Sequence, residues 1–267
     1  MKINNKCTLI ISTYNWPQAL NLVLMSLLEQ TVLPYEVIIA DDGSRDETRV
    51  LIDSYKKILP VPLLHIWHED IGFRKTIILN KAFAQAGSDY IIQVDGDIML
   101  HKNFVEDHLR HRKKGHFIKG SRGRLNKKLT ERILNDKKIS LCSLTPGVKS
   151  TINATRFPLL APIFYKDDNL SRNVKGCNFA VWKNDFISVN GYDNDISGWG
   201  HEDIDLAARL INAGIKRRQL KMTAVCYHLH HEILSRNKEA ENLDRYHEVV
   251  LNKVRACKNG YKQLNAD

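Results

Sequence analysis

Two carboxylates stand close together in Asp95-Gly96-Asp97, directly after the apolar run Tyr90–Val94. Carboxylate oxygens suit Mg²⁺ or Mn²⁺, and an ion held by one or two of them normally completes its shell with water and substrate phosphate. An isolated triplet of this kind is more typical of a surface turn, because Asp and Gly are both favoured in turns. A second acidic pair, Asp41-Asp42, follows another apolar run, and this context favours a site for a divalent cation and a diphosphate ligand.

A third acidic pair, Glu202-Asp203, ends the segment GWGHED at the start of a predicted helix. The dipole of a helix favours anionic side chains at this end, so the two acids could simply be capping residues. Glycines on both sides of Trp199, however, allow the indole to face a pocket. The segment is therefore a candidate for part of a binding site.

Three histidines, His228, His230 and His231, follow a predicted strand in the second half of the chain. A neutral imidazole can complete a metal shell that Asp97 begins. Alternation along a strand puts His228 and His230 on one face and His231 on the other, unless the strand has already ended. The pattern alone leaves open which imidazole is the ligand.

The elements that must position these residues follow the pattern of β/α units on a parallel sheet, in which short apolar runs alternate with amphipathic stretches. We expect strands at Cys7–Ser12, Glu36–Ala40, Leu63–Trp67 and Tyr90–Val94. We expect helices from a cap at Asn15 to about Glu29, from a capping box at Ser44 and Glu47 to about Ile58, and at Thr76–Ala86. Ligands collect at the carboxyl ends of such strands, where the first two acidic pairs fall.

The rest of the chain is harder to divide into elements. Residues 110–138 are strongly basic, which favours either a solvated helical face or a surface for membrane headgroups or an acidic acceptor. Residues 141–173 contain three prolines and little periodicity, so we expect a long connection or a mobile excursion. Beyond Gly176 we expect a helix at Asp203–Ala213 closed by Gly214, a strand at Thr223–Tyr227 and a terminal helix at Lys238–Lys258.

The composition is that of an ordinary globular protein of 267 residues, with 43% hydrophobic and 26% charged residues and a formal net charge of +10. The positive charge attracts polyanions of any kind, so it excludes few classes of function. Five dispersed cysteines without CxxC spacing argue against a disulfide framework or a thiolate zinc site and for a reducing compartment. Because the sequence shows neither a secretory signal nor an apolar stretch of the ~18 residues that a membrane-spanning helix needs, we expect a cytoplasmic location.

Six segments together carry a resemblance to a known family. They are STYN (12–15), ADDGS (40–44), EDIGFRK (69–75), VDGD (94–97), GCNFAVWK (176–183) and GWGHED (198–203). In this order, between about Thr8 and His231, they resemble the inverting glycosyltransferases of family 2 with the GT-A fold, most closely the catalytic domains of bacterial chondroitin polymerases and related capsule or lipopolysaccharide sugar transferases. The resemblance implies a single α/β domain with a Rossmann-like, mostly parallel sheet flanked by helices. Its nucleotide-binding half would occupy about residues 1–110, the basic and proline-containing excursion about 111–173, and the acceptor-binding half with the terminal helix about 174–267.

The resemblance also implies which residues bind a UDP-sugar donor. Thr13, Tyr14 and Asp42 would hold the uracil and ribose. Arg74 and Lys75 could add charge-assisted bonds to phosphate, although exposed loop cations are as typical of such a turn. The donor-binding candidates in full are Thr13, Tyr14, Asn15, Asp42, Arg74, Lys75, Asn80, Asp95, Gly96 and Asn178. At the position before Asn80, relatives often have Arg, whereas this chain has Leu79. This departure puts one donor contact in doubt.

The metal ligands implied by the resemblance are Asp97, which would hold Mn²⁺ or Mg²⁺ against the two phosphates, and a histidine. Both His231 and His228 could occupy the position of that histidine, and His231 is preferred. Asp95 would lie near the ribose and Asn178 beneath the donor sugar. The cation would stabilise the departing UDP as a Lewis acid.

The catalytic residues implied by the resemblance are Asp203, as the base that removes the acceptor hydroxyl proton, and Glu202, which would also bind the acceptor. Trp199 would offer an apolar platform for a sugar ring. The expected reaction is a direct displacement that moves a sugar from a UDP-sugar to a hydroxyl of a glycan or lipid-linked acceptor, in cell-surface polysaccharide synthesis. Peripheral contact with the membrane through the basic stretch is compatible with such an acceptor, and the sequence leaves the oligomeric state open.

Two other functions are compatible with parts of the sequence. A metal-dependent nucleotidyltransferase would normally display a glycine-rich phosphate loop near the N-terminus, and Ser12–Asn15 is not one. A nonenzymatic protein that binds polyanions or nucleic acid could use the basic stretch. That function leaves the acidic pairs unexplained, because carboxylates repel phosphate unless a metal intervenes, so we expect no nucleic-acid partner.

Overall fold

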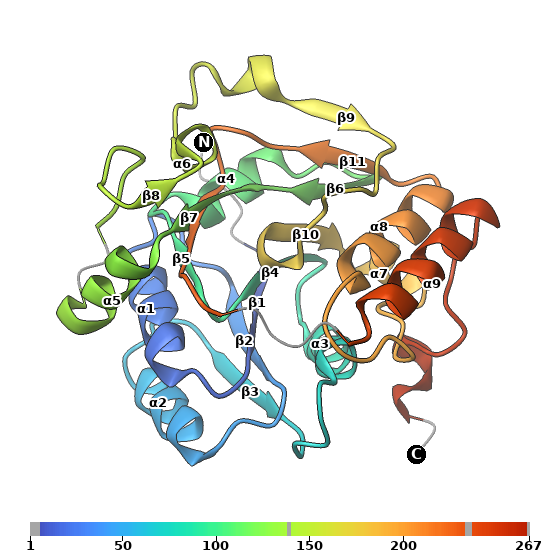
Figure 1. Ribbon diagram of the computed structural model, residues 1–267, viewed down its shortest axis with the longest axis horizontal. Coiled ribbons are helices and arrows are strands. Elements are labelled where there is room, and N and C mark those ends of the chain that lie inside the picture. The colour runs from blue at the N-terminus through green and yellow to red at the C-terminus, as the bar shows by residue number, and fades with distance from the viewer. Residues whose placement is uncertain (1–5, 138–139, 233–236, 266–267) are drawn as a thin grey trace.

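The computed structural model describes residues 6–137, 140–232 and 237–265. Within these ranges a sheet of eight strands forms the centre of the molecule (Figure 1). In order across the sheet, the strands are β3 (Leu63–Trp67), β2 (Glu36–Asp41), β1 (Thr8–Thr13), β4 (Tyr90–Asp95), β10 (Phe179–Trp182), β6 (His116–Lys119), β11 (Lys216–Gln219) and β9 (Lys166–Asp168). The first four are parallel, whereas β10 is antiparallel to both of its neighbours. The four predicted strands are therefore present, and their carboxyl ends meet at one edge.

Alternate residues of the central strands enter two hydrophobic layers. On β1, Leu9 and Ile11 pack into one layer with α1 (Pro17–Leu28) and α2 (Asp46–Lys56). Ile10 packs into the other layer, to which α3 (Lys75–Gln85), α7 (Lys183–Ser188) and α8 (Glu202–Asn212) contribute. Because both faces of the sheet are covered, its central strands are almost continuously apolar.

A second sheet carries histidines to the carboxyl end of β4. Its strands are, in order, β5 (Ile98–Leu100), β12 (Val225–His228), β7 (Ser121–Leu125) and β8 (Val148–Lys149). Strand β5 begins directly after Asp97 and pairs antiparallel with β12, so that Ile98 lies opposite His228. The Leu229 N–H then donates to the Asp97 carbonyl oxygen at 3.0 Å. This register joins an acid of the first half of the chain to histidines of the second.

The remaining helical elements include the C-terminal part of the chain. They are α4 (Phe104–His111), α5 (Lys127–Asp136), α6 (Thr151–Ala154), α9 (Glu239–Leu251) and the 3₁₀ turns η1 (Ala161–Phe164), η2 (Gly176–Asn178) and η3 (Tyr261–Asn265). Gly214, with φ of +91°, follows α8 as predicted. The predicted terminal helix ends at Leu251 rather than Lys258, because Lys253 turns into the left-handed region with φ of +50°. No helix in the described ranges is long and apolar enough to cross a bilayer.

The predicted caps of the first two helices are wrong. Helix α1 follows Trp16 and α2 follows Arg45, and neither preceding residue makes a side-chain cap bond. Instead, the Asn15 N–H donates to Ser44 Oγ at 2.8 Å, and Asn15 Oδ1 accepts from the Arg45 N–H at 2.9 Å. The two polar residues thus join the loops after β1 and β2 to each other.

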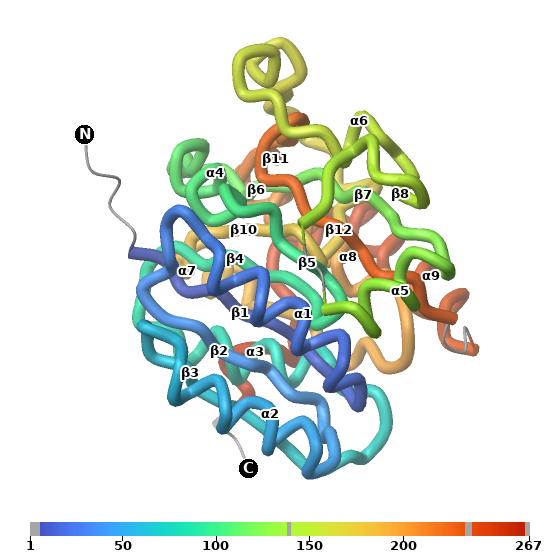
Figure 2. Tube along the Cα trace, turned by 90° about the vertical axis from the view of Figure 1, so that its left-hand side faces the viewer, coloured from blue at the N-terminus to red at the C-terminus, as the bar shows by residue number. Residues whose placement is uncertain are grey.

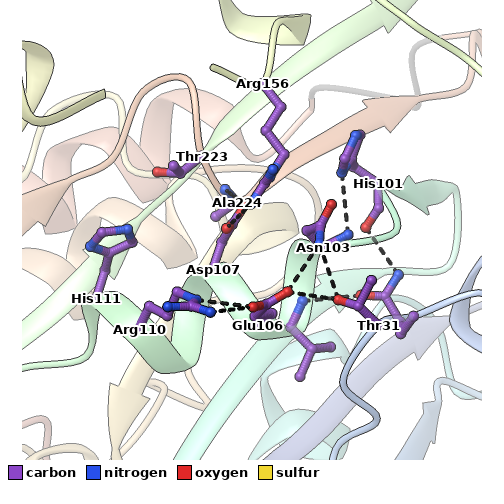
Figure 3. Close-up of polar contacts among 12 residues, drawn as sticks. Thr31, His101, Asn103, Glu106, Asp107, Arg110, His111, Arg156, Thr223 and Ala224 are labelled. Carbon is purple, nitrogen blue, oxygen red and sulfur yellow. Dashed lines mark hydrogen bonds and ion pairs between the residues drawn. The ribbon is translucent and has the colours of Figure 1, made fainter. Parts of the chain in front are cut away.

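Residues 141–173, which we expected to form a long connection or a mobile excursion, contain several regular elements. They supply β8 and α6 beside β7, and β9 at the edge of the main sheet. Arg156 anchors the segment, because its Nε and Nη2 each donate at 2.8 Å to the carboxylate of Asp107 on α4 (Figure 3). Periodicity missed these elements because their partners are distant in the sequence. The yellow turn around η1 stands off from the rest of the molecule (Figure 2).

The basic stretch is divided among several elements, from the end of α4 to α5. Arg110 pairs with Glu106 at 2.6 Å, and the Lys114 ammonium lies 3.5 Å from the centre of the Trp182 ring. Other members lie on β7 and α5. Lys138, the last of the stretch, lies outside the described residues.

A buried ion pair fixes α8. The Arg209 guanidinium, which is 0% exposed, donates to Asp205 Oδ2 at 2.6 and 2.9 Å and to the carbonyl oxygens of Val189 and Gly191. We predict that Arg209→Met lowers the free energy of unfolding by about 3–5 kcal/mol, because it leaves the Asp205 charge buried without a counter-charge. Urea denaturation measures the change.

The matched control for this prediction is Arg49→Met. Arg49 pairs with Asp46 at 3.0 Å, but both side chains are exposed. Such a pair contributes little to stability. Equal midpoints for the Arg209→Met and Arg49→Met variants would show that the buried pair does not fix α8.

Candidate active site

The acidic end of β4 lies against the first turn of α3. Asp95 Oδ1 accepts from Ser12 Oγ at 2.8 Å and lies 2.9 Å from Lys75 Nζ. Desolvation favours the neutral carboxyl, but Lys75 and Ser12 outweigh it and hold the pKa of Asp95 below its usual value. The Gly96 N–H donates to the Ser12 carbonyl oxygen at 2.6 Å, and a Cβ at Gly96 would lie 3.0 Å from Thr13 Oγ1. Asp95 is therefore a carboxylate held in place by the protein.

Asp97, His228 and His231 form a cluster whose ligand atoms all lie within 4.8 Å of one another. Each imidazole has its Nε2 3.3 Å from Asp97 Oδ2. Strand β12 ends at His228, so alternation no longer holds beyond it, and the chain turns His231 to the same side. His230 is exposed, and its N–H donates to Thr130 Oγ1. The structure brings both candidate histidines to Asp97 and leaves His230 out.

The cluster fits a divalent cation. Asp97 Oδ1 is buried and has no hydrogen-bond partner among the residues that the structure describes, and a cation would satisfy it. His231 Nδ1 lies 2.7 Å from the Glu232 carbonyl oxygen, which can only accept, so Nδ1 donates there and Nε2 is the ring nitrogen that a cation beside Asp97 would bind. Desolvation and then the charge of Arg122 lower the pKa of His228 to about 4, which keeps its imidazole neutral.

Lys75 lies between the two acidic pairs of the site. Its Nζ is 2.9 Å from Asp95 Oδ1 and 3.5 Å from Glu202 Oε1. Desolvation disfavours the ammonium, but Asp95, Glu202 and Asp203 together raise the pKa of Lys75 well above its usual value. Desolvation and the Asp95 charge raise the pKa of Asp97 to about 7. The sequence suggested a phosphate contact for Lys75; the structure shows its ion pairs with carboxylates, and the phosphate contact stays a prediction.

Asp203 lies in the first turn of α8 against the backbone that precedes β10. A Cβ at Gly176 would lie 2.5 Å from Asp203 Oδ1, so a side chain at this position would displace the carboxylate. This oxygen is buried and has no hydrogen-bond partner within the described part of the chain. Desolvation and the neighbouring Glu202 charge raise the pKa of Asp203 to about 7. A carboxyl group that titrates near neutral pH is suited to proton transfer.

Trp199 lies in the loop that leads into α8. Gly198 and Gly200 on either side of it have φ of +73° and +108°, so the backbone there requires glycine, as the sequence suggested. Trp199 itself is half-buried. Its role as a platform for a sugar ring stays a prediction.

The acidic pair at the carboxyl end of β2 is bound to two histidines. Asp41 Oδ2 lies 2.9 Å from His65 Nε2, and Asp42 Oδ1 lies 2.7 Å from His68 Nε2. Asp42 Oδ2 also accepts from the Arg74 N–H at 3.0 Å. A carboxylate has about four acceptor sites, so Asp42 keeps capacity for a further donor. Its contact with a nucleoside stays a prediction.

The segment after β1 lies beside this pair. Thr13 is buried, and its carbonyl oxygen accepts from the Asp42 N–H at 3.0 Å. Tyr14 is 50% exposed, and its hydroxyl donates to Asp70 Oδ2 at 2.9 Å. Asn15 is occupied by the loop contacts described above. An exposed aromatic ring beside buried acids is compatible with the predicted contact to a base.

Three donor-binding candidates have structural partners instead of open positions. Asn80 is 0% exposed, and its side-chain amide bonds the backbone N–H and carbonyl of Tyr192. Asn178 is 2% exposed, and its amide donates to carbonyl oxygens of Ser121 and of the residue before β12. The Arg74 guanidinium donates to a neighbouring loop carbonyl. These partners occupy the polar groups of the three side chains, and their contact with a donor stays a prediction.

Several residues at the site were not singled out from the sequence. Ser12 bonds Asp95, and the Trp16 ring packs edge-on against His231 with centroids 6.2 Å apart. His68 binds Asp42. Ser12 and His68 stand at or just past the end of a predicted strand, which is the signal that identified the acids.

Solved structures share this fold. The mannosyltransferase PcManGT from Pyrobaculum calidifontis, in complex with GDP-Man and Mn²⁺, aligns over 92% of this chain and 64% of its own, with a TM-score of 0.60 and 16% identity. S. aureus TarS 1-349, in complex with UDP, aligns over 97% of this chain and 68% of its own, with a TM-score of 0.62 and 14% identity. At such identities the likeness shows the fold alone, which is the GT-A fold expected from the sequence.

Relatives of known activity are similar over most of the chain. Validoxylamine A glucosyltransferase of Streptomyces hygroscopicus subsp. limoneus is 26% identical over 228 residues, which are 78% of this chain and 48% of that protein. Chondroitin synthase of Pasteurella multocida (strain Pm70) is 25% identical over 224 residues, 78% of this chain and 23% of that protein. The chain thus spans between about a quarter and half of the length of these relatives.

Family models cover both halves of the site. The model described as N-terminal domain of galactosyltransferase matches residues 164–232, which include Asp203, His228 and His231. The model described as Glycosyl transferase family 2 matches residues 8–173, which include the acidic end of β4 and make up more than half of the chain. The chain therefore belongs to glycosyl transferase family 2.

Proposed function

We propose that this family 2 glycosyltransferase uses a UDP-sugar and inverts the anomeric centre as it transfers the sugar to a hydroxyl of a glycan or lipid-linked acceptor. The observation that carries the proposal is the arrangement around Lys75. On one side lie Asp95 and the cluster formed by Asp97 and its two histidines, and on the other lie Glu202 and Asp203. A neighbouring structure of the same fold is a complex with GDP-Man and Mn²⁺, and another is a complex with UDP, which supports a nucleotide-sugar donor.

Asp97, His228 and His231 would hold the cation. Imidazole nitrogens suit transition metals, whereas Mg²⁺ prefers oxygen ligands, so this donor set favours Mn²⁺ over Mg²⁺. When bound, the cation would neutralise the diphosphate of the departing nucleotide as a Lewis acid. Lys75 would keep Asp95 ionised and would hold Glu202 in place beside it.

Asp203 would act as the general base. It would take the proton of the acceptor hydroxyl, and the acceptor oxygen would form a bond to the anomeric carbon. The bond from that carbon to the terminal phosphate oxygen of UDP would break, and its electron pair would leave with UDP. A single displacement of this kind inverts the configuration and needs no covalent enzyme intermediate. Glu202 and Trp199 would position the acceptor.

The family membership favours sugar transfer over the nucleotidyltransferase and polyanion-binding alternatives. It also accounts for the acidic pairs, which a polyanion-binding protein would leave unexplained. The similarity to chondroitin synthase supports, within this proposal, a role in cell-surface polysaccharide synthesis at the cytoplasmic side of the membrane.

The turn around η1 supports peripheral contact with that membrane. Apolar side chains there are exposed, with Leu159 at 85% and Ile163 at 75%. The turn projects from the molecule in both overall views (Figures 1 and 2). Exposed apolar side chains on a protein with a net charge of +10 can enter the interface of an anionic bilayer. We propose this turn, rather than the divided basic stretch, as the principal contact.

The first prediction concerns the metal ligands. We expect His228→Ala and His231→Ala each to weaken Mn²⁺ binding by about 10- to 100-fold, and Asp97→Ala to abolish it together with metal-dependent UDP binding. Isothermal titration with Mn²⁺ and then UDP measures both. His230→Ala is the matched control and should bind Mn²⁺ like the wild type. Weakening of equal size in the His230→Ala variant would contradict the assignment.

The second prediction concerns the base. Asp203→Asn should keep UDP and Mn²⁺ binding but lower kcat by about 10²- to 10⁴-fold. Because the base works in its deprotonated form and its pKa is raised to about 7, kcat/KM for the acceptor should rise with pH and level off above about pH 7. UDP release over a pH series measures both effects.

The control for the base is Asp244→Asn, an exposed carboxyl on α9, which should retain wild-type turnover. Wild-type turnover in the Asp203→Asn variant would refute the base assignment. Retention of the anomeric configuration, read by NMR of the product, would refute the single displacement.

The third prediction concerns the membrane. The double variant Leu159→Glu, Ile163→Glu should lose sedimentation with vesicles of phosphatidylglycerol and phosphatidylcholine, because two charges oppose insertion. Leu144→Glu, at an 87% exposed position outside the turn, should sediment like the wild type. A wild-type protein that stays in the supernatant would contradict the proposed contact.

A further inference from the structure

A cavity of about 150 Å³ lies beside β6, β7 and the backbone that leads into β10. Four of its ten lining residues are cations, and none is a carboxylate. The cations are Lys119, Arg122, Lys175 and Lys221. We call this cavity the basic pocket.

The cations of the basic pocket have no acidic partner among the described residues. The ammonium groups of Lys119, Lys175 and Lys221 make neither an ion pair nor a hydrogen bond there, and Arg122 donates only to Cys177 Sγ, at 3.1 Å. Desolvation raises the pKa of Cys177 to about 12 despite Arg122, so the thiol is neutral and does not balance the charge. Desolvation, with Arg217 and Lys221, lowers the pKa of Lys119. An anion in the pocket would relieve this accumulation of positive charge.

The basic pocket adjoins the residues of the proposed reaction. Lys175 and Cys177 flank Gly176, the glycine against which Asp203 Oδ1 packs. On the other side, Arg122 lies on β7, the strand that pairs with β12 and thereby with His228. The pocket is thus next to the base and to the strand that carries a metal ligand.

A wall of the basic pocket comes from the segment 141–173. Asn153 of α6 lines the pocket, and Arg156 three residues later is anchored to Asp107 (Figure 3). The same segment carries the exposed apolar turn around η1. The donor diphosphate already has a proposed site at Asp97 and its histidines, so the pocket is left for another anionic group.

We propose that the basic pocket binds a carboxylate or phosphate group of the acceptor, and that the acceptor is therefore an anionic glycan or a phosphate-linked saccharide. This assignment rests on the proposed function, because it takes Asp203 as the base that meets the acceptor. Lysine and arginine side chains recognise both groups through charge-assisted hydrogen bonds. A neutral sugar would offer these four cations no ion pair.

A binding experiment without metal tests the pocket independently of transfer. Inorganic phosphate and D-glucuronate, with D-glucose as the neutral counterpart, are titrated in EDTA against the wild type and the double variant Lys175→Gln, Lys221→Gln. We expect both anions to bind the wild type, glucose not to bind, and the double variant to bind the anions at least about tenfold more weakly. Lys216→Gln, an exposed lysine on β11, is the matched control. Equal affinities in the double variant and the control would overturn the pocket assignment.

A transfer experiment decides which substrate carries the anion. Oligosaccharide acceptors that end in a hexuronate or a sugar phosphate are compared with acceptors that end in a neutral hexose. The double variant should raise KM for the anionic acceptors about tenfold and leave KM for the neutral ones and for the UDP-sugar unchanged. If the double variant instead weakens the binding of UDP-glucuronic acid but not that of UDP-glucose, the pocket binds an anionic group of the donor, and the acceptor assignment is wrong. Loss of UDP release with every donor would refute the proposed function, whereas the metal-free titration would still report on the pocket.

Discussion

Crowding of negative charge at the carboxyl edge of β4 is the constraint on which the rest of the site depends. Asp95, Asp97, Glu202 and Asp203 gather there, and only part of their charge is balanced by Lys75, which is bound to Asp95 and Glu202. Partly desolvated carboxylates that lie close together cannot all ionise at their usual pKa. The consequence is a division of roles. Asp95 stays ionised beside the lysine, whereas the pKa values of Asp97 and Asp203 rise to about 7.

The crowding is possible because segments far apart in the sequence are held rigidly. The pairing of β5 with β12 fixes the position of His228 relative to Asp97. The pair formed by Arg209 and Asp205, together with two backbone carbonyls, fixes α8 and hence the acids of its first turn. The stability of the surrounding structure offsets the repulsion between the acids.

Local patterns predicted the parallel half of the fold well. The strands before Asp41 and Asp95 are continuous apolar runs, and the rule that ligands collect at their carboxyl ends located both acidic pairs. The position of His231 could not be read from alternation, because it depends on where β12 ends. Asn80 and Asn178 show a different limit. Their residue types suit ligand binding, but their burial follows from contacts with Tyr192, Ser121 and other residues that lie far away in the sequence.

The edge strand β9 and the wall formed by α6 were missed for the same reason, since short non-local pairings leave no periodicity. Asn15 and Ser44 were assigned to caps on their own helices, and each loop instead bonds the other. Polar side chains near helix starts have several backbone partners within reach, and sequence alone does not rank them.

The separate anchoring of α8 and of the segment 141–173 has an evolutionary consequence. Asp203, the proposed base, lies on a helix held by Arg209, whereas the outer wall of the basic pocket is anchored by Arg156 within a loop-rich stretch. Substitutions or insertions in that stretch can change which saccharide is recognised while the proton-accepting geometry stays the same. Related enzymes can therefore change their acceptor specificity while the proposed catalytic geometry is kept.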